Sequence, residues 1–208
     1  MSGKRDYLQQ AALFPERADY PPGFRYQPEF LSGDEERGLA GWIATLPLRP
    51  FEFRGFRGGR RVVYFGSRYD YSRQAIDMAA PVPDELMPVM VRAARWSGHA
   101  PDEIRQAMAT EYAVGAPIGW HRDRPQFGDV IGISLLTPAP FRLRRPVNGK
   151  WERKTIMLAP RSIYLLTGEV RNAWQHSIAP LGTLRYSITL RTLDADFARR
   201  LEQQQTAA

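Results

Sequence analysis

The 208-residue chain contains no cysteine, and it has only three histidines and three lysines. Without cysteine there can be no disulfide, no thiolate metal site and no cysteine nucleophile, and this absence fits a reducing compartment. No apolar run is as long as a membrane-spanning helix requires, and the first residues lack the pattern of a signal peptide. From these absences we expect a cytoplasmic protein that does not enter a membrane.

The charged residues are biased toward one sign and one residue type. The formal net charge is +7, the pI is about 10.0, and 26 of the 29 basic residues are arginines. A positive excess favours a polyanionic partner, because guanidinium groups bind phosphates with paired hydrogen bonds and stack on bases. The arginines are spread along the chain, however, so the codon composition of the source genome explains the bias equally well.

The first half of the chain predicts an irregular arm followed by two helices. Residues 1–30 are rich in proline, tyrosine and phenylalanine, which is typical of an arm without regular structure. Ser32 and Glu35 have the spacing of a capping box. A second helix is expected over residues 84–96, with Gly98 ending it. The apolar residues that share one face of the first helix are Leu39, Trp42, Ile43 and Leu46.

Between these helices lies the glycine- and arginine-rich segment FRGFRGGRRVVYFGSRYDYSRQ, residues 53–74. Glycine and arginine interleaved with aromatic residues favour a hairpin or a flexible flap over a helix. For Tyr64 and Phe65 in particular, packing in a β-core is the preferred interpretation. No linker separates this half of the chain from the next one, so we expect one structural domain.

From about residue 107 the sequence predicts short strands separated by turns. Regular short strands with proline and glycine turns are typical of a sandwich or jelly roll. We therefore expect an α+β fold, with the arm, helices and flap over residues 1–106, a β-core over 107–193 and a frayed tail over 194–208. The seven predicted strands are QAMATEYAV, VIGISLL, FRLRRP, KTIMLA, RSIYLLTG, AWQHSIAP and LRYSITLRTL.

Two of the three histidines are candidate metal ligands. In GWHRDRPQFGDV, residues 119–130, the side chains of His121 and Asp123 point to the same face if the segment is extended. His176 lies in a later strand-like segment and would complete the set. Two histidines and one carboxylate form the facial triad of non-haem Fe(II) oxygenases, but zinc hydrolases use the same ligands. The triad alone leaves both chemistries open, and so does a chance His-x-Asp on a surface loop. His99 is expected in a surface turn.

The segment RYSITLR alternates polar and apolar residues. Arg185, Ser187, Thr189 and Arg191 therefore share one face of the predicted strand. If this face points inward, its two guanidinium groups need anionic partners, and a short diacid held between them would supply both. The hydroxyl of Tyr112 could assist. An amphipathic strand with solvated arginines is the alternative.

Several stretches, taken in order, resemble the AlkB family of Fe(II)- and 2-oxoglutarate-dependent dioxygenases. They are EYAVGAPIGWHRD, LLTGEVRNAWQHSI and RYSITLR, and upstream RRVVYFG and PVPDEL look like the nucleotide-recognition lid of that family. The resemblance covers roughly residues 50–193. It implies a double-stranded β-helix, or jelly roll, core with N-terminal helices and a nucleotide-recognition flap, which agrees with the strand pattern.

Carried over residue by residue, the resemblance implies a set of iron ligands and a set of cosubstrate contacts. The iron ligands would be His121, Asp123 and His176. The contacts to 2-oxoglutarate would be Arg191 for one carboxylate and Arg185 for the other, with Tyr112 and Ser187 beside them. Arg122 and Arg124 would point away from the metal because strand residues alternate.

The resemblance further implies a monomer that uses O2 and acts on alkylated nucleic acid, DNA or RNA. The alkyl group would be oxidised, with release of succinate, CO2 and an aldehyde, from a base that is flipped out or single-stranded. A hydroxylase or demethylase with the same core, acting on RNA or on a protein, is the alternative, and a non-catalytic nucleic-acid-binding module is another. The expected substrate contacts are Arg54, Arg57, Arg60, Arg61, Tyr69, Tyr71 and Trp120.

Two departures and one further cluster qualify the resemblance. Thr110 stands where family members often carry an asparagine that helps to hold 2-oxoglutarate. Pro125 stands where the best-known repair member has an acidic residue beside the alkylated base, so a cationic lesion would be read differently here. Arg142, Arg144 and Arg145 form a second basic cluster, which could contact phosphates or could be a solvated face.

Overall fold

The computed structural model describes residues 19–53, 56–70 and 75–206, whose strands form three sheets. The first sheet, in spatial order, contains β1 (Phe24–Gln27), β11 (Ile163–Leu166), β8 (Phe127–Leu135), β13 (Arg185–Leu193), β6 (Gln106–Tyr112), β3 (Phe56–Phe65) and β2 (Arg49–Phe53). The second contains β10 (Lys150–Leu158), β9 (Ala139–Val147), β12 (Gln175–Ile178) and β7 (Ile118–His121). The third pairs β4 (Ser67–Asp70) with β5 (Ala75–Met78).

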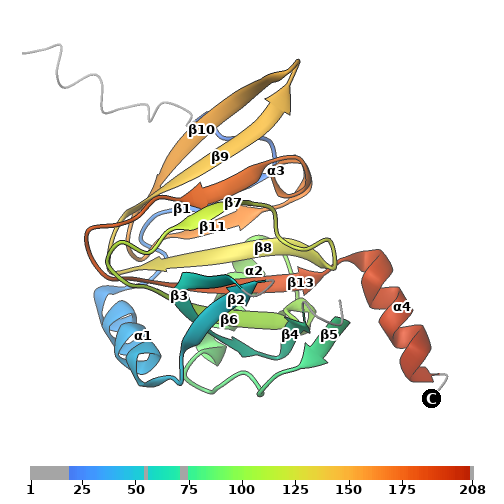
Figure 1. Ribbon diagram of the computed structural model, residues 1–208. Helices are drawn as coiled ribbons and strands as arrows, with labels where there is room; N and C mark the ends of the chain where they lie inside the picture. Colours follow the sequence, from blue (N-terminus) through green and yellow to red (C-terminus); the bar gives the residue numbers. More distant parts are fainter. Residues whose placement is uncertain (1–18, 54–55, 71–74, 207–208) are drawn as a thin grey trace, which may run out of the picture.

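The seven-stranded and four-stranded sheets form the two layers of the jelly roll that the sequence predicts. Figure 1 shows β9, β10, β12 and β7 on one side of the molecule, and β8, β13 and β6 on the other. All seven predicted strands of the β-core are present, as β6, β8, β9, β10, β11, β12 and β13. The space between the two layers is filled by a mostly apolar cluster that includes Phe141, Leu143, Tyr164 and Trp174.

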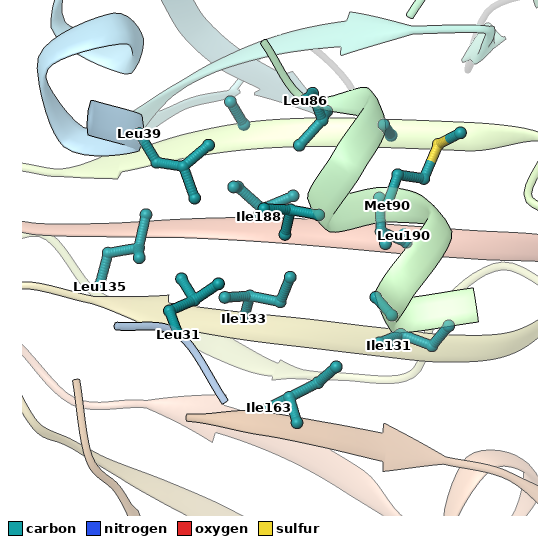
Figure 2. Packing of buried hydrophobic residues seen from close by; sticks show 14 of the residues in the cluster. Leu31, Leu39, Leu86, Met90, Ile131, Ile133, Leu135, Ile163, Ile188 and Leu190 are labelled. Carbon is teal, nitrogen blue, oxygen red and sulfur yellow. The ribbon is translucent and has the colours of Figure 1, made fainter. Parts of the chain in front are cut away.

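The other face of the seven-stranded sheet is covered by α1 (Gly33–Thr45) and α2 (Met87–Ser97). Figure 2 shows Leu86 and Met90 of the α2 region directed toward Ile188 and Leu190 of β13. Alternation along β13 explains this packing, because Ile188 and Leu190 face the helices while Arg185 and the other polar residues face the second sheet. The helices therefore hold the sheet that carries the predicted arginine pair.

The helix boundaries follow the sequence signals closely. Ser32 and Glu35 form the expected capping box at the start of α1. The second helix begins about three residues later than expected, because Leu86 is the residue before its first turn and Pro88 lies inside that turn, where proline is tolerated. It ends at Gly98, which adopts a left-handed conformation with φ of 90°.

Four elements differ from the sequence-based expectations. Part of the expected arm is the edge strand β1, which pairs with β11 over four residues. The expected tail contains α4 (Ala195–Thr206), whose first turn is capped by Asp194, since its carboxylate accepts backbone N–H groups of Asp196 and Phe197. Two short helical segments, α3 (Gly168–Asn172) and the 3-10 turn η2 (Pro101–Glu103), were not anticipated.

The flap region contributes strands to two sheets. Residues 60–65 of β3 pair with β6, so this part of the expected flap extends the seven-stranded sheet. Phe65 is buried against α1 and α2, as preferred from the sequence. The β4–β5 hairpin forms the separate small sheet. Of the helices in the described ranges, none is both long enough and apolar enough to cross a membrane.

Gly132 of β8 shows how closely the strands pack beside the site. It lies directly opposite Tyr164 of β11 in the sheet register. A Cβ atom at this position would overlap the ring of Tyr164, so only glycine leaves room for that ring between the layers. The tyrosine in turn packs against Phe24 and Phe141.

Candidate metal and cosubstrate site

The three predicted metal ligands meet at one end of the four-stranded sheet. His121 is the last residue of β7, Asp123 follows it by two residues, and His176 lies opposite His121 on β12. One ligand atom from each of the three side chains lies within 4.8 Å of the others. Two imidazoles and a carboxylate at this spacing match the ligands of a facial Fe(II) site. The geometry therefore brings together residues that are 53 positions apart in the sequence.

Hydrogen bonds orient His121 and Asp123 and leave one coordinating atom free on each. Nδ1 of His121 donates to the backbone carbonyl of Gly119 at 2.8 Å, and a carbonyl only accepts, so Nδ1 carries the proton and Nε2 has a lone pair. Oδ1 of Asp123 accepts from Nε and Nη2 of Arg191 at 2.9 and 2.6 Å. The other carboxylate oxygen, Oδ2, is directed toward Nε2 of His176 at 3.5 Å.

The electrostatics of the site keep all three ligands in the protonation states that a metal requires. Burial on its own would raise the pKa of Asp123, but Arg191 and the two imidazoles hold that pKa well below its usual range. Burial, reinforced by the neighbouring His121, lowers the pKa of His176 to about 3. Burial also lowers the pKa of His121, although Asp123 opposes this effect. Neutral imidazoles and an ionised carboxylate are therefore ready to bind a cation at neutral pH.

Arg171 holds the loop that carries Asp123, a role that the sequence did not reveal. Its guanidinium group is buried and donates to four backbone carbonyl oxygens. These acceptors belong to Asp123, Arg124, Phe127 and Gly128. Burial lowers the pKa of Arg171, with Asp123 opposing this effect. The only sequence signal was the position of this arginine in the GEVRNAWQH stretch, which gives no hint of backbone acceptors more than 40 residues away.

The predicted arginine pair of β13 divides into two different environments. Arg191 binds the metal-ligand carboxylate of Asp123, and its Nη1 donates to Oε1 of Gln106 at 2.7 Å. The carboxylate beside Arg191 is thus one of the protein's own, whereas we expected one from 2-oxoglutarate. Arg185, at the other end of the strand face, forms no ion pair with a described residue.

The surroundings of Arg185 fit a bound carboxylate. The side chain is 1% exposed, its Nε donates to Oγ of Ser134 at 3.2 Å, and its Cζ lies 4.8 Å from the ring centre of Tyr112. Nη1 of Arg185 and Oγ1 of the buried Thr110 have no hydrogen-bond partner within the described structure. A buried cation without a counter-ion is costly, so these surroundings of Arg185 suit an anionic ligand such as 2-oxoglutarate.

The expected substrate contacts have separate locations. Arg60 lies opposite Tyr112 on the site-facing side of β3, where its charge contributes to the low pKa of His121. Arg61 points to the other face of the sheet and forms a two-pronged ion pair with Glu111 at 2.7 and 2.8 Å. Arg61 therefore lies away from the metal, because strand neighbours alternate. Arg54 and Tyr71 lie outside the described residues, as do the side chains of Arg57 and Tyr69.

Other expected positions also have defined partners. Trp120 alternates with His121 on β7 and lies on the outer face of the four-stranded sheet, where it contacts Arg142 and Arg144. Arg122 donates to the backbone carbonyl of Asn172, and its expected direction away from the metal stays a prediction. His99 follows the turn at the end of α2 but is only 19% exposed, because its Nε2 contacts Asp129 at 3.2 Å. It is thus less accessible than a surface turn residue.

Comparisons with known proteins place this geometry in a family. The family model of the 2OG-Fe(II) oxygenase superfamily matches residues 49–191. The tRNA (carboxymethyluridine(34)-5-O)-methyltransferase ALKBH8 of Mus musculus is 28% identical over 168 residues, which cover 77% of this chain and 24% of that protein. The Alkylated DNA repair protein ALKBH8 homolog of Arabidopsis thaliana is 28% identical over 181 residues, or 76% of this chain and 51% of that protein. The chain thus spans about a quarter to a half of these relatives.

Solved structures with the same fold agree with this assignment. The structure of OsALKBH1 has a TM-score of 0.65 at 16% identity and covers 83% of this chain and 98% of that one. A Pseudomonas putida prolyl-4-hydroxylase has a TM-score of 0.57 at 14% identity, covering 83% and 94%. These likenesses confirm the double-stranded β-helix, and the family model covers most of the chain, including the triad. The chain therefore belongs to the 2OG-Fe(II) oxygenase superfamily, as an AlkB-like dioxygenase that uses Fe(II) and 2-oxoglutarate.

Proposed function

We propose that this dioxygenase removes alkyl groups from the bases of nucleic acid by oxidation. The observation that carries the proposal is Arg60, an arginine on the site-facing side of β3 whose charge acts on the metal ligand His121. A cationic group at this position suits a substrate with a phosphate backbone. The relatives support the same class of substrate, since the mouse protein is named for a tRNA uridine and the Arabidopsis protein for alkylated DNA.

The metal and cosubstrate would be held by residues from both sheets. In this proposal His121, Asp123 and His176 hold iron. Arg185 pairs with the distal carboxylate of 2-oxoglutarate, and its neighbours on the same face of the seven-stranded sheet offer hydroxyl groups to the cosubstrate. These neighbours are Thr110, Tyr112 and Ser187. When bound, iron and 2-oxoglutarate supply the oxidation by O2 of the carbon attached to the base nitrogen, with release of succinate, CO2 and an aldehyde.

The protein contributes positioning around this chemistry. Arg191 fixes the side chain of Asp123 through Oδ1, so that Oδ2 points toward the metal position. Arg171 fixes the backbone of the same residue. Two supports on one ligand restrict its movement, which is what a metal site with open positions for substrate and O2 requires. The aromatic and aliphatic side chains between the sheets keep water away from this region.

The substrate side is proposed to differ from that of the well-known repair enzyme. Pro125 is exposed and has no acidic group to offer a cationic base, so we expect selection by shape and by contacts to the backbone. Arg60, whose guanidinium Cζ lies 3.9 Å above the ring of Phe51, is the proposed phosphate contact nearest to the metal. Arg61 is left out of the proposal because Glu111 already neutralises it.

The test is turnover of 2-oxoglutarate to succinate with Fe(II), ascorbate and air. Single-stranded DNA and RNA oligonucleotides carrying 1-methyladenine or 3-methylcytosine are compared with unmethylated ones, and formaldehyde is measured. We expect turnover and formaldehyde release to rise with methylated oligonucleotides and to disappear in His121→Ala. In Arg185→Gln we expect a higher KM for 2-oxoglutarate.

Turnover that requires His121 but ignores every methylated oligonucleotide would contradict the nucleic-acid part of the proposal. A protein substrate would then be the next to examine. If Arg185→Gln left the KM for 2-oxoglutarate unchanged, the role given to Arg185 would be wrong, whatever the substrate.

A further inference from the structure

The outer face of the four-stranded sheet carries a second group of aromatic and basic side chains. We call it the outer platform and define it as Trp120, Arg142, Arg144, Trp151 and Arg153. Strand alternation places it on the side opposite the metal ligands, because Trp120 precedes His121 on β7. On β10 the residues at odd positions, from Trp151 to Met157, are exposed, while those at even positions are more buried.

The centre of the outer platform is an arginine between two indole rings. The Cζ of Arg144 lies 4.3 Å from the ring centre of Trp120 and 4.2 Å from that of Trp151. Its Nε donates to the amide oxygen of Gln175 at 2.8 Å, and Nε of Arg142 donates to the hydroxyl of Ser177 at 3.1 Å. These partners are neutral, so they orient the guanidinium groups without cancelling their charge.

The charge of the outer platform is uncompensated within the described structure. Arg144 and Arg153 are directly opposite each other on β9 and β10, and neither forms an ion pair with a described carboxylate. Like charges at directly opposed positions of a sheet are destabilising. The neighbouring Arg145 differs, because it points to the other face and binds Glu152 and Glu169 at 2.7 and 2.6 Å. Two opposed arginines on the outer face thus do not stabilise the sheet, and an external anion bound between them would remove their repulsion.

The positive charge of the protein is concentrated in this hairpin. Residues 139–158 contain six basic residues and one acidic residue, a formal charge of +5 against +7 for the whole chain. The one acidic residue, Glu152, lies on the other face and forms an ion pair with Arg145. Arg145 and Lys154 also pair with carboxylates outside the hairpin, Glu169 and Asp19. The hairpin would therefore attract a polyanion mainly through its other basic residues.

Trp151 makes the outer platform more than a charged surface. Its side chain lies on the edge strand β10 and is 40% exposed, although it is the largest type of apolar side chain. Pairing with β12 ends at Arg144, so the last residues of β9 and the first of β10 extend beyond that strand. Figure 1 shows this hairpin reaching away from the rest of the molecule. An indole backed by a guanidinium group and open to solvent can accept a stacked base.

We propose that the outer platform binds a single-stranded segment of nucleic acid outside the iron site. One base stacks on Trp151, and backbone phosphates bind Arg144 and Arg153. Stacking requires an unpaired base, which is why the occupant is a single strand and not a duplex. The inference rests on the proposed function, since the platform would hold the strand on which the reacting base lies.

The experiment measures binding of unmethylated single-stranded RNA and DNA of about 12 nucleotides by fluorescence anisotropy, a length within the site sizes of stacking platforms. We expect Trp151→Ala to weaken binding about tenfold and Trp151→Phe to retain most of it, because a ring is kept. Met157→Ala is the matched control, since Met157 lies on the same face of β10, is 57% exposed and offers no ring. We expect it to bind as the unchanged protein does.

The phosphate contacts are tested by salt dependence. We expect Arg153→Gln to weaken binding and to reduce the slope of log affinity against log salt by about one. Arg95→Gln, an exposed arginine of α2 on the far side of the seven-stranded sheet, should leave the slope unchanged. Thermal unfolding of each variant shows whether the fold is intact.

The outcomes separate this inference from the proposed function. If Trp151→Ala binds the oligonucleotide as tightly as Met157→Ala does, the platform is overturned. The same holds if polyglutamate, an anion without bases, displaces the oligonucleotide equally well from Trp151→Ala and from the unchanged protein. Dealkylation can still stand in either case. If platform variants lose binding but no methylated oligonucleotide is turned over, the platform stands and the proposed function falls. An unchanged protein that binds no oligonucleotide overturns the platform, and the turnover assay alone then decides the proposed function.

Discussion

Arg171 and Arg191 divide the support of Asp123 between its backbone and its side chain. Arg191 binds Oδ1, and Arg171 binds the carbonyl of the same residue and three others, between Arg124 and the start of β8. Both guanidinium groups are nearly buried, so their hydrogen bonds form in a region of low dielectric constant where they are strong. A metal ligand on a loop can be held as firmly in this way as one on a strand.

We therefore predict that Arg171→Gln lowers metal affinity even though residue 171 touches no metal. Loss of the carbonyl contacts frees the backbone at Asp123, and partners of this kind are typically worth about tenfold to hundredfold in affinity. Mn²⁺ titration by calorimetry measures the effect. Arg122→Gln is the control, because Arg122 makes one exposed contact to a backbone carbonyl near the same site. Equal Mn²⁺ affinity in Arg171→Gln and the unchanged protein would show that the loop is held by other contacts.

At the scale of elements, α1 depends on the capping box that its sequence predicted. The carboxylate of Glu35 accepts from the backbone N–H of Ser32 at 2.8 Å and pairs with Arg92 of α2 at 2.7 Å. The hydrogen bond from Arg92, followed by that from Ser32, lowers the pKa of Glu35 below its ordinary value of 4.5. The same carboxylate thus starts one helix and connects it to the other helix on the sheet.

This predicts an acid-sensitive contribution to stability. A carboxylate whose pKa is lower in the folded protein stabilises it above the unfolded pKa, and this contribution is lost as pH falls through the folded pKa. Glu35→Gln should therefore unfold at a lower temperature at pH 7, with the difference shrinking below about pH 4.5. Thermal unfolding from neutral to acidic pH measures this. Glu85→Gln, an exposed residue ahead of α2, is the control, and a constant difference at every pH for Glu35→Gln would contradict the assignment.

At the scale of the whole molecule, the site joins the two sheets. His121 and His176 belong to the four-stranded sheet, whereas Arg191, which holds Asp123, belongs to the seven-stranded sheet. A metal bound by this triad would connect the layers through its ligands and their supports. Metal that binds the folded chain but not the unfolded one must stabilise the entire fold.

We predict that Mn²⁺ at about one hundred times its dissociation constant stabilises the protein by about 2.7 kcal/mol. Unfolding by urea with and without Mn²⁺ measures the difference. His121→Ala should show no such shift, since it lacks one of the three ligands. Equal stabilisation of His121→Ala by Mn²⁺ would mean that the ion binds elsewhere.

Local patterns were sufficient for the parts of the molecule whose structure is decided by near neighbours. Alternation predicted that the polar residues of β13 share one side. It was not used for Trp120, which we expected as a substrate contact and which lies instead against Arg142 and Arg144 on the outer face. Ser32 and Glu35 predicted the start of α1. The family resemblance added the role of His176, whose own surroundings in the sequence contain no second ligand.

The sequence by itself therefore determined the strands and the capped helix, because each is encoded in the spacing of residues along one segment. The predicted triad needed the family resemblance as well, since His176 lies far from His121 and Asp123 in the sequence. Only the tertiary structure decided which groups meet across segments. It paired Arg61 with Glu111, Arg191 with Asp123 and Arg171 with a distant loop. The physical reason is that these contacts depend on sheet register and layer packing, which bring together residues that no local periodicity relates.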